Sequence, residues 1–158
     1  PPKKGRTHVL RLIRELYTTE PTGNNTSIGD ALAYVNRLLN RRAIIVLASD
    51  FEDKEFEKQH KITSQKHDLV NLVVHDRLEE QLPDVGIIPL VDAETNEQQL
   101  VDTSSKSVRE SYRRKVLEEQ EKLKEYFLNN KMDTVHVYTN ESYIQPLVSF
   151  FQRRIGRY

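Results

Sequence analysis

The chain has 158 residues, which fits a single domain large enough to bury a hydrophobic core. Its 24 basic and 24 acidic residues cancel, so no overall field points to nucleic acid or to an anionic membrane. The absence of cysteine excludes disulfides and zinc–thiolate sites and is typical of a cytoplasmic protein. No apolar run approaches the ~20 residues of a membrane span. We therefore expect a cytoplasmic protein with no membrane or nucleic-acid partner.

Two amphipathic helices are predicted in the first part of the chain, which begins Pro-Pro-Lys-Lys without Met, as a fragment of a longer protein would. The first has the apolar spacing of a helix with one buried stripe, at Val9, Leu12, Ile13 and Leu16. The second follows the loop 23–27 and has the same spacing over 28–39. Thr26 or Ser27 is placed to accept its first free N–H groups as the N-cap.

The segment 41–53, RRAIIVLASDFED, is the centre of the predicted fold. Its six apolar residues, 43–48, lie between charged neighbours, a pattern that predicts a strand buried on both faces in a parallel sheet. Asp50 follows directly, and ligand sites in open α/β sheets lie just past the carboxyl ends of strands. Asp50 is therefore a candidate for chemistry; the alternative is that it caps the next helix.

The rest of the chain supplies two more strands and a hairpin. A mostly exposed helix over 54–66 leads to a strand over 69–75, which is apolar except for Asn71. A hairpin is predicted to pair 86–91 with 98–102, and Pro89 places it at an edge.

A long helix over 104–129, a third strand over 134–138 and a closing helix complete the chain. Ser107 with Glu110, and Ser142 with Gln145, have the spacing of capping boxes for the two helices. This order predicts one α/β domain, a three-layer open parallel sheet with helices on both faces and a hairpin inserted at about 86–102.

Other candidate sites are weaker. The five histidines show no metal-ligand spacing, and His75 and His136 are expected to be structural. Asp50 could form a Mg²⁺-dependent phosphoester-cleaving cluster with Glu52 and Asp53. The alternative places Glu52 and Asp53 in the first turn of a helix, where its dipole favours acids.

Four segments, 8–16, 25–51, 67–95 and 143–154, together resemble the carboxyl-terminal part of the domain-of-unknown-function family 58. Members of that family resemble von Willebrand factor A domains, whose strand order is 3-2-1-4-5-6. The resemblance implies that this chain holds strands 4, 5 and 6 of such a domain.

The von Willebrand A fold has a metal-ion-dependent adhesion site built from three loops. Thr26 matches its second loop and Asp50 its third, with Ser27 and Ser49 beside them as binding residues. The first loop, Asp-x-Ser-x-Ser, is absent from this sequence. The resemblance therefore implies Mg²⁺ or Mn²⁺ in a longer parent protein and none bound by this chain alone.

The implied function is a non-enzymatic protein–protein interaction domain with no catalytic residue, and the implied partner is a MoxR-type AAA+ ATPase. The alternative is a Mg²⁺-dependent hydrolase or phosphoesterase that uses the Asp50 cluster. If strands 1–3 are absent, the strand 43–48 becomes an open edge. We therefore expect a homodimer in which two copies of this strand pair antiparallel.

Overall fold

The protein is described by a computed structural model over residues 3–19, 26–53, 55–91 and 98–156. Its main sheet has three parallel strands, β1 (Ile44–Ser49), β2 (Asp68–His75) and β5 (Asp133–Tyr138), in the order β1-β2-β5. The parallel sheet and its three strands are therefore as predicted. Within the described ranges β1 pairs with β2 alone, so its position at an edge is confirmed as well.

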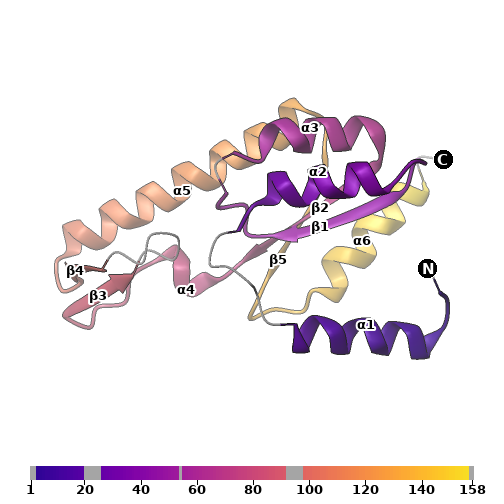
Figure 1. Ribbon diagram of the computed structural model, residues 1–158. Coiled ribbons are helices and arrows are strands. Elements are labelled where there is room, and N and C mark those ends of the chain that lie inside the picture. Colours follow the sequence, from indigo (N-terminus) through magenta and orange to yellow (C-terminus); the bar gives the residue numbers. More distant parts are fainter. Residues whose placement is uncertain (1–2, 20–25, 54, 92–97, 157–158) are drawn as a thin grey trace.

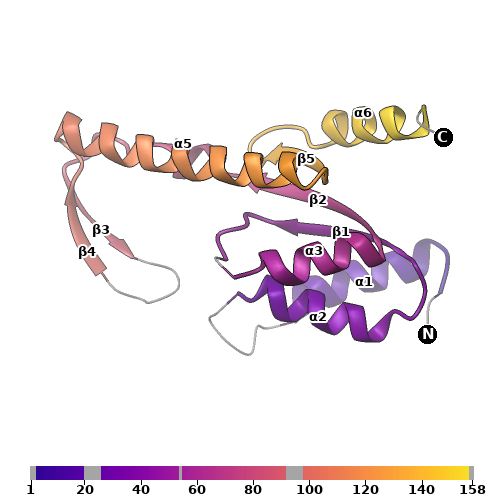
Figure 2. The ribbon, with the colours of Figure 1, turned by 90° about the horizontal axis from the view of Figure 1, so that it is seen from above.

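Helices cover both faces of this sheet, which confirms the layered α/β architecture (Figures 1 and 2). On one face lie α2 (Ile28–Leu38), α3 (Glu57–Lys66) and the last turns of α5 (Lys106–Asn129). On the other face lies α6 (Ile144–Ile155).

Each face has its own apolar core. The core under α2 and α3 is built on large side chains: Ile28, Leu32, Phe51, Phe56, Val73 and Phe127. The core under α6 is smaller and made mostly of valine: Val70, Val135, Val137 and Phe150. Successive β2 residues point to opposite faces, which is why Val70 and Val73 belong to different cores. This explains the nearly continuous apolar run of β2.

The first part of α5 extends away from the sheet and carries the hairpin at its far end (Figure 1). The hairpin pairs β3 (Ile87–Val91) antiparallel with β4 (Gln98–Asp102), as predicted; its loop lies outside the described residues. A short helix, α4 (Arg77–Glu80), which the sequence did not predict, lies between β2 and the hairpin. No helix in the described ranges is long and apolar enough to cross a membrane.

The apolar stripe of α1 (Arg6–Thr18) is not buried, contrary to the prediction. The helix forms at the predicted place, but no residue of it is buried, and Figure 1 shows it apart from the sheet. Val9, Leu12 and Ile13 are each more than two-fifths exposed. The periodicity therefore predicted the helix correctly, but nothing in the described chain covers its apolar face.

The prediction that strand 43–48 is buried on both faces is also wrong for this chain. Exposure alternates along β1: Ile44 is 71% exposed and Val46 54%, while Ile45 and Leu47 are half-buried. The half-buried residues lie on the α2 side of the sheet. On the other side α6 packs against β2 and β5 and leaves β1 uncovered.

Both predicted capping boxes are wrong. Helix α5 begins at Lys106, so Ser107 is a helical residue, and the actual N-cap, Ser105, forms no side-chain capping bond. Helix α6 begins at Ile144 after Tyr143, which likewise has no side-chain capping bond. Both predictions rested on a Ser followed three residues later by Glu or Gln, a spacing that polar helical sequence also produces by chance.

Candidate functional site at the carboxyl ends of the strands

The segment after β1 is a short loop in which side chains accept hydrogen bonds from backbone N–H groups. Phe51 has a φ of 63°, in the left-handed region that an aromatic residue seldom adopts, and its side chain is buried. Its ring meets Phe56 and Phe127 edge to face, with centroids 5.4 and 5.2 Å apart. This packing compensates for the strained backbone. It also turns the chain so that Asp50 and Glu52 remain exposed.

Ser49 and Asp50 are held by short-range hydrogen bonds within this loop. The Ser49 hydroxyl accepts from the Phe51 N–H at 3.1 Å and donates to Asp50 Oδ1 at 3.2 Å. The Glu52 N–H donates to the same Asp50 oxygen at 3.4 Å. Asp50 therefore has a defined orientation at the carboxyl end of β1 and still faces solvent.

Asp53 joins this loop to the start of α2. Its carboxylate accepts from the Ile28 N–H at 2.8 Å and from the Glu55 N–H at 2.9 Å. Ser27 is the N-cap of α2, because its hydroxyl accepts from the Asp30 N–H at 3.1 Å. The two segments that the sequence singled out, 26–27 and 49–50, are thus brought to the same end of the sheet.

The structure settles two alternatives that the sequence left open. Ser27, and not Thr26, caps α2, and the exposed Thr26 remains outside the helix. Glu52 and Asp53 do not lie in the first turn of a helix, because α3 begins only at Glu57. Asp53 instead caps α2 from a distant part of the chain, and nothing in the local sequence signals such a contact.

Few of the described side chains at this end of the sheet offer an oxygen atom that could bind a divalent cation. Thr26 and Asp50 offer exposed oxygen ligands of the kind that Mg²⁺ prefers. Asp53 already accepts two backbone hydrogen bonds. Across the described parts of the chain, no group of three or more His, Asp or Glu side chains is placed to hold a metal ion. Waters and a partner would have to supply most of the coordination.

A second polar cluster lies where β2 and β5 end. His75 Nε2 and His136 Nδ1 are 2.9 Å apart, the ring planes differ by 11°, and the centroids are 5.2 Å apart. Tyr138 lies beside His75, and Arg77 lies over the Tyr138 ring at 4.9 Å and pairs with Glu141. These side chains tie the ends of β2 and β5 to α4.

The histidine pair shares one hydrogen bond. The distance between the ring centroids equals the N···N distance plus about one ring radius on each side. The two rings therefore face each other edge to edge, nitrogen to nitrogen, and are not stacked. One nitrogen must donate and the other must accept. Partial burial lowers the pKa of His75 and of the more exposed His136, and the neighbouring His75 and Lys124 lower the pKa of His136 further. The pair is therefore held with at least one ring neutral.

Sequence reasoning treated these two histidines as structural but did not place them together. Their contact follows from the register, because Val73 lies beside His136 and His75 lies beside Tyr138. Side chains of His75 and His136 then share one face of the sheet as diagonal neighbours. The predicted boundaries of the two strands do not determine which residues lie side by side.

His60 explains the one polar residue inside β2. It is fully buried, with Nε2 2.7 Å from Asn71 Oδ1 and Nδ1 3.1 Å from the Tyr126 hydroxyl. The Asn71 amide also donates to the Asp133 carbonyl at 3.1 Å. Burial lowers the pKa of His60 and raises that of Tyr126 to about 12, so both stay neutral. The buried polar groups of this network are therefore hydrogen-bonded to one another, as is usual inside a protein core.

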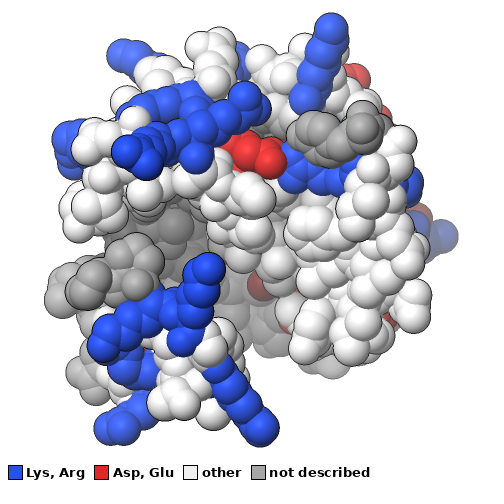
Figure 3. All heavy atoms as spheres, turned by 90° about the vertical axis from the view of Figure 1, so that its right-hand side faces the viewer, with Lys and Arg blue, Asp and Glu red and all other residues white. Residues whose placement is uncertain are grey.

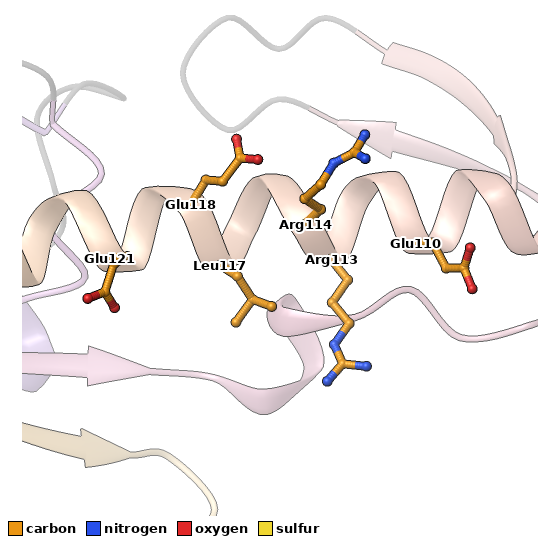
Figure 4. A pocket seen from close by; sticks show the side chains of 6 residues that line it. All are labelled: Glu110, Arg113, Arg114, Leu117, Glu118 and Glu121. Carbon is orange, nitrogen blue, oxygen red and sulfur yellow. The ribbon is translucent and has the colours of Figure 1, made fainter.

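The surface of α5 shows no converging functional groups. A shallow hollow of about 520 Å³ is lined by six α5 residues, namely Glu110, Arg113, Arg114, Leu117, Glu118 and Glu121. Figure 4 shows Arg114 and Glu118 on one side of the helix and Arg113 and Leu117 on the other. Acidic and basic side chains are mixed along this surface, which is typical of a solvated helix face.

Charge is unevenly distributed between the two ends of the sheet. Figure 3 shows the end at which β1 begins, where Lys and Arg side chains gather and few acidic side chains are visible. Arg154 at this end is not a free anion site, because it pairs with Asp68 and, at 3.2 Å, with Asp133. The exposed carboxylate of Asp50 lies at the opposite end, after β1.

Comparison with known proteins identifies the family of this chain. The family model described as "Protein of unknown function DUF58" matches residues 1–122. The "Uncharacterized protein MAV169" of Mycobacterium avium is 30% identical over 98 residues, which are 60% of this chain and 58% of that protein. The match thus covers less than two thirds of that relative's length. No solved structure matches the chain. Since the family model spans most of the sequence, the chain belongs to the DUF58 family.

Proposed function

We propose that this chain is part of a non-enzymatic protein–protein interaction domain of the von Willebrand factor A type. The proposal rests on one observation: the loop after β1 and the start of α2 meet through the Asp53–Ile28 hydrogen bond. Asp50 and Thr26 are thereby exposed at the same end of the sheet. In an open α/β sheet this is the end at which ligands bind.

The sheet order supports this assignment. In this assignment β1, β2 and β5, which neighbour one another in that order, would be strands 4, 5 and 6 of a von Willebrand A domain. In a complete site, Thr26 and Asp50 would contribute oxygen ligands to Mg²⁺ or Mn²⁺, and a carboxylate of the partner would complete the shell. Ser49 would orient Asp50, and Ser27 would fix the start of α2.

We prefer a protein–protein interaction domain to a metal-dependent hydrolase that uses Asp50, Glu52 and Asp53. A two-metal or metal-hydroxide reaction needs several carboxylates that converge on one point. Asp53 is committed to the N–H groups of Ile28 and Glu55, so the three acids do not form such a cluster. A partner of the MoxR-type AAA+ ATPase class is the proposed binding target.

The test is a pull-down of a purified MoxR-type AAA+ ATPase by the native protein, with Mg²⁺ or with EDTA. We expect Mg²⁺-dependent capture that Asp50→Ala and Thr26→Ala both abolish. Glu118→Ala, which removes an exposed carboxylate on α5, is the matched control and should retain capture. Capture that is unchanged by EDTA and by Asp50→Ala would contradict the proposal. Mg²⁺-dependent phosphoester hydrolysis that is lost in Asp50→Ala would instead support the hydrolase.

A further inference from the structure

We propose that the free edge of β1 binds the same edge of a second copy of this chain, so that the two β1 strands pair antiparallel about a twofold axis at Val46. This inference does not rest on the proposed function, since it concerns the edge of the sheet and needs neither metal nor another protein. Dimerisation and capture of the ATPase can therefore fail separately.

The backbone of β1 is available for pairing on one side. The Asp68 N–H donates to the Ala43 carbonyl at 2.8 Å, so the polar groups of residue 43 point toward β2. These groups alternate sides along a strand, and those of Ile44, Val46 and Ala48 therefore point to the free edge. Nothing in the described ranges pairs with them.

The side chains at this edge are those of an interface and not of a protected edge. Ile44, Val46 and Ala48 are exposed on the face that α6 leaves uncovered, and β1 contains no Pro and no charge. Natural edge strands are usually interrupted by such residues. The hairpin differs in this respect, because β3 contains Pro89, which cannot donate to a ladder.

Charge complementarity specifies the second copy as the occupant. Arg41 and Arg42 precede β1, Asp50 follows it, and neither arginine has an ion-pair partner among the described residues. Antiparallel pairing places the basic start of one β1 beside the acidic end of the other. Parallel pairing of two copies would place like charges together, which is unfavourable.

The backbone directions also fix the register. Residues whose polar groups face the free edge must lie opposite one another in hydrogen-bonded pairs. The pairing that centres the strand places Val46 opposite Val46 and Ile44 opposite Ala48. Continued by two residues, it places Arg42 opposite Asp50 of the second copy. The exposed apolar side chains then form one stripe across the joined sheet.

Disulfide trapping tests this register, and the natural chain has no cysteine to interfere. In Val46→Cys the two Cα atoms would lie about 5.5 Å apart, within disulfide range. In the matched control Ile44→Cys they would be offset by four residues, about 13 Å along the strand. We expect mild oxidation to cross-link Val46→Cys at least about tenfold more than Ile44→Cys. Equal yields, or none at residue 46, would overturn the proposal.

Light scattering coupled to size-exclusion chromatography tests the association itself, in EDTA. We expect a dimer for the wild type at tens of micromolar and a monomer for Val46→Lys, because two lysines would meet on the twofold axis. Val91→Lys is the matched control: Val91 is 53% exposed in β3, against 54% for Val46 in β1. A monomeric wild type, or equal effects of both lysines, would contradict the inference.

A charge-reversal pair tests the predicted ion pair. Arg42→Glu and Asp50→Arg should each weaken self-association about tenfold, since each variant opposes like charges at both symmetry-related contacts. An equimolar mixture should form heterodimers, because both contacts again join opposite charges. Circular dichroism checks that each variant is folded. Failure of the mixture to associate more tightly than either variant alone would exclude the Arg42–Asp50 contact.

Discussion

The Asp53 carboxylate accepts a hydrogen bond from the Ile28 N–H at 2.8 Å and so fastens the loop after β1 to the first turn of α2. Gly29 lies next to this contact, and a Cβ there would be 3.6 Å from the Glu55 carbonyl oxygen. The two segments therefore approach closely over several residues. The Asp53–Ile28 contact therefore sets the spacing between Thr26 and Asp50.

Asp53→Ala should lower the free energy of unfolding by about 1–2 kcal/mol, because two backbone N–H groups lose their acceptor. Asp50→Ala is the matched control, and its cost should stay within about 0.5 kcal/mol, since Asp50 is exposed. Urea denaturation followed by circular dichroism measures both. If the two substitutions cost the same, Asp50 would be a structural residue and a poor candidate for partner binding.

Ser27→Ala and Thr26→Ala should likewise differ. Ser27 accepts from the Asp30 N–H as the N-cap of α2, so its loss should cost about 1 kcal/mol of unfolding free energy. Thr26 lies outside the helix, and its substitution should leave stability unchanged. The measurement is again urea denaturation. A destabilised Thr26→Ala would show that its hydroxyl has a structural partner, and loss of partner binding in that variant could then no longer be assigned to the metal.

The strands and the hairpin could be predicted because apolar runs and turn residues determine them locally. The run 43–48 and the segment 69–75 became β1 and β2 within one residue at each end, and 98–102 matched β4. The position of Asp50 also followed, because a residue just after a parallel strand must lie at the carboxyl edge of the sheet. These predictions use only neighbours in sequence.

The contacts that build the site could not be predicted in the same way. Asp53 and Ile28 are 25 residues apart, and their hydrogen bond depends on how α2 packs on the sheet. The left-handed Phe51 is stabilised by aromatic neighbours from α5 and from the segment before α3. The His75–His136 contact depends on strand register. The prediction that α1 is buried was wrong for a related reason, since periodicity identifies an apolar face but not what covers it.

Metal affinity of the chain itself is the next prediction. Thr26 and Asp50 supply too few protein oxygens to replace the waters of Mg²⁺, and a partner carboxylate is missing. Isothermal titration calorimetry of Mg²⁺ and Mn²⁺ into the chain should therefore give no binding in the micromolar range. Micromolar affinity that Asp50→Ala removes would show that this chain forms a metal site by itself.

Three histidines should make the fold sensitive to mild acid. Burial lowers the pKa of His60, His75 and His136 below the value of 6.5 that an unfolded chain would have. The hydrogen bond from Asn71 partly opposes this shift at His60, and the charge of Glu80 partly opposes it at His75. At a pH between the folded and unfolded pKa values, the unfolded chain binds more protons than the folded chain. The free energy of unfolding should therefore be at its plateau above about pH 6.5 and should fall as the pH drops below that value.

Urea denaturation at closely spaced values between pH 7.5 and pH 5 measures this loss, in a window where most carboxylates remain ionised. His136→Gln should reduce the slope of the unfolding free energy against pH, because it removes one of the three titrating groups. It also removes a neighbouring ring whose positive charge would oppose protonation of His75. His60→Gln should reduce the slope independently, since His60 lies in a separate network with Asn71 and Tyr126. A stability that is flat or rises as the pH falls from 6.5 to 5 would mean that these rings are protonated in the folded protein, and the neutral His75–His136 hydrogen bond would then be wrong.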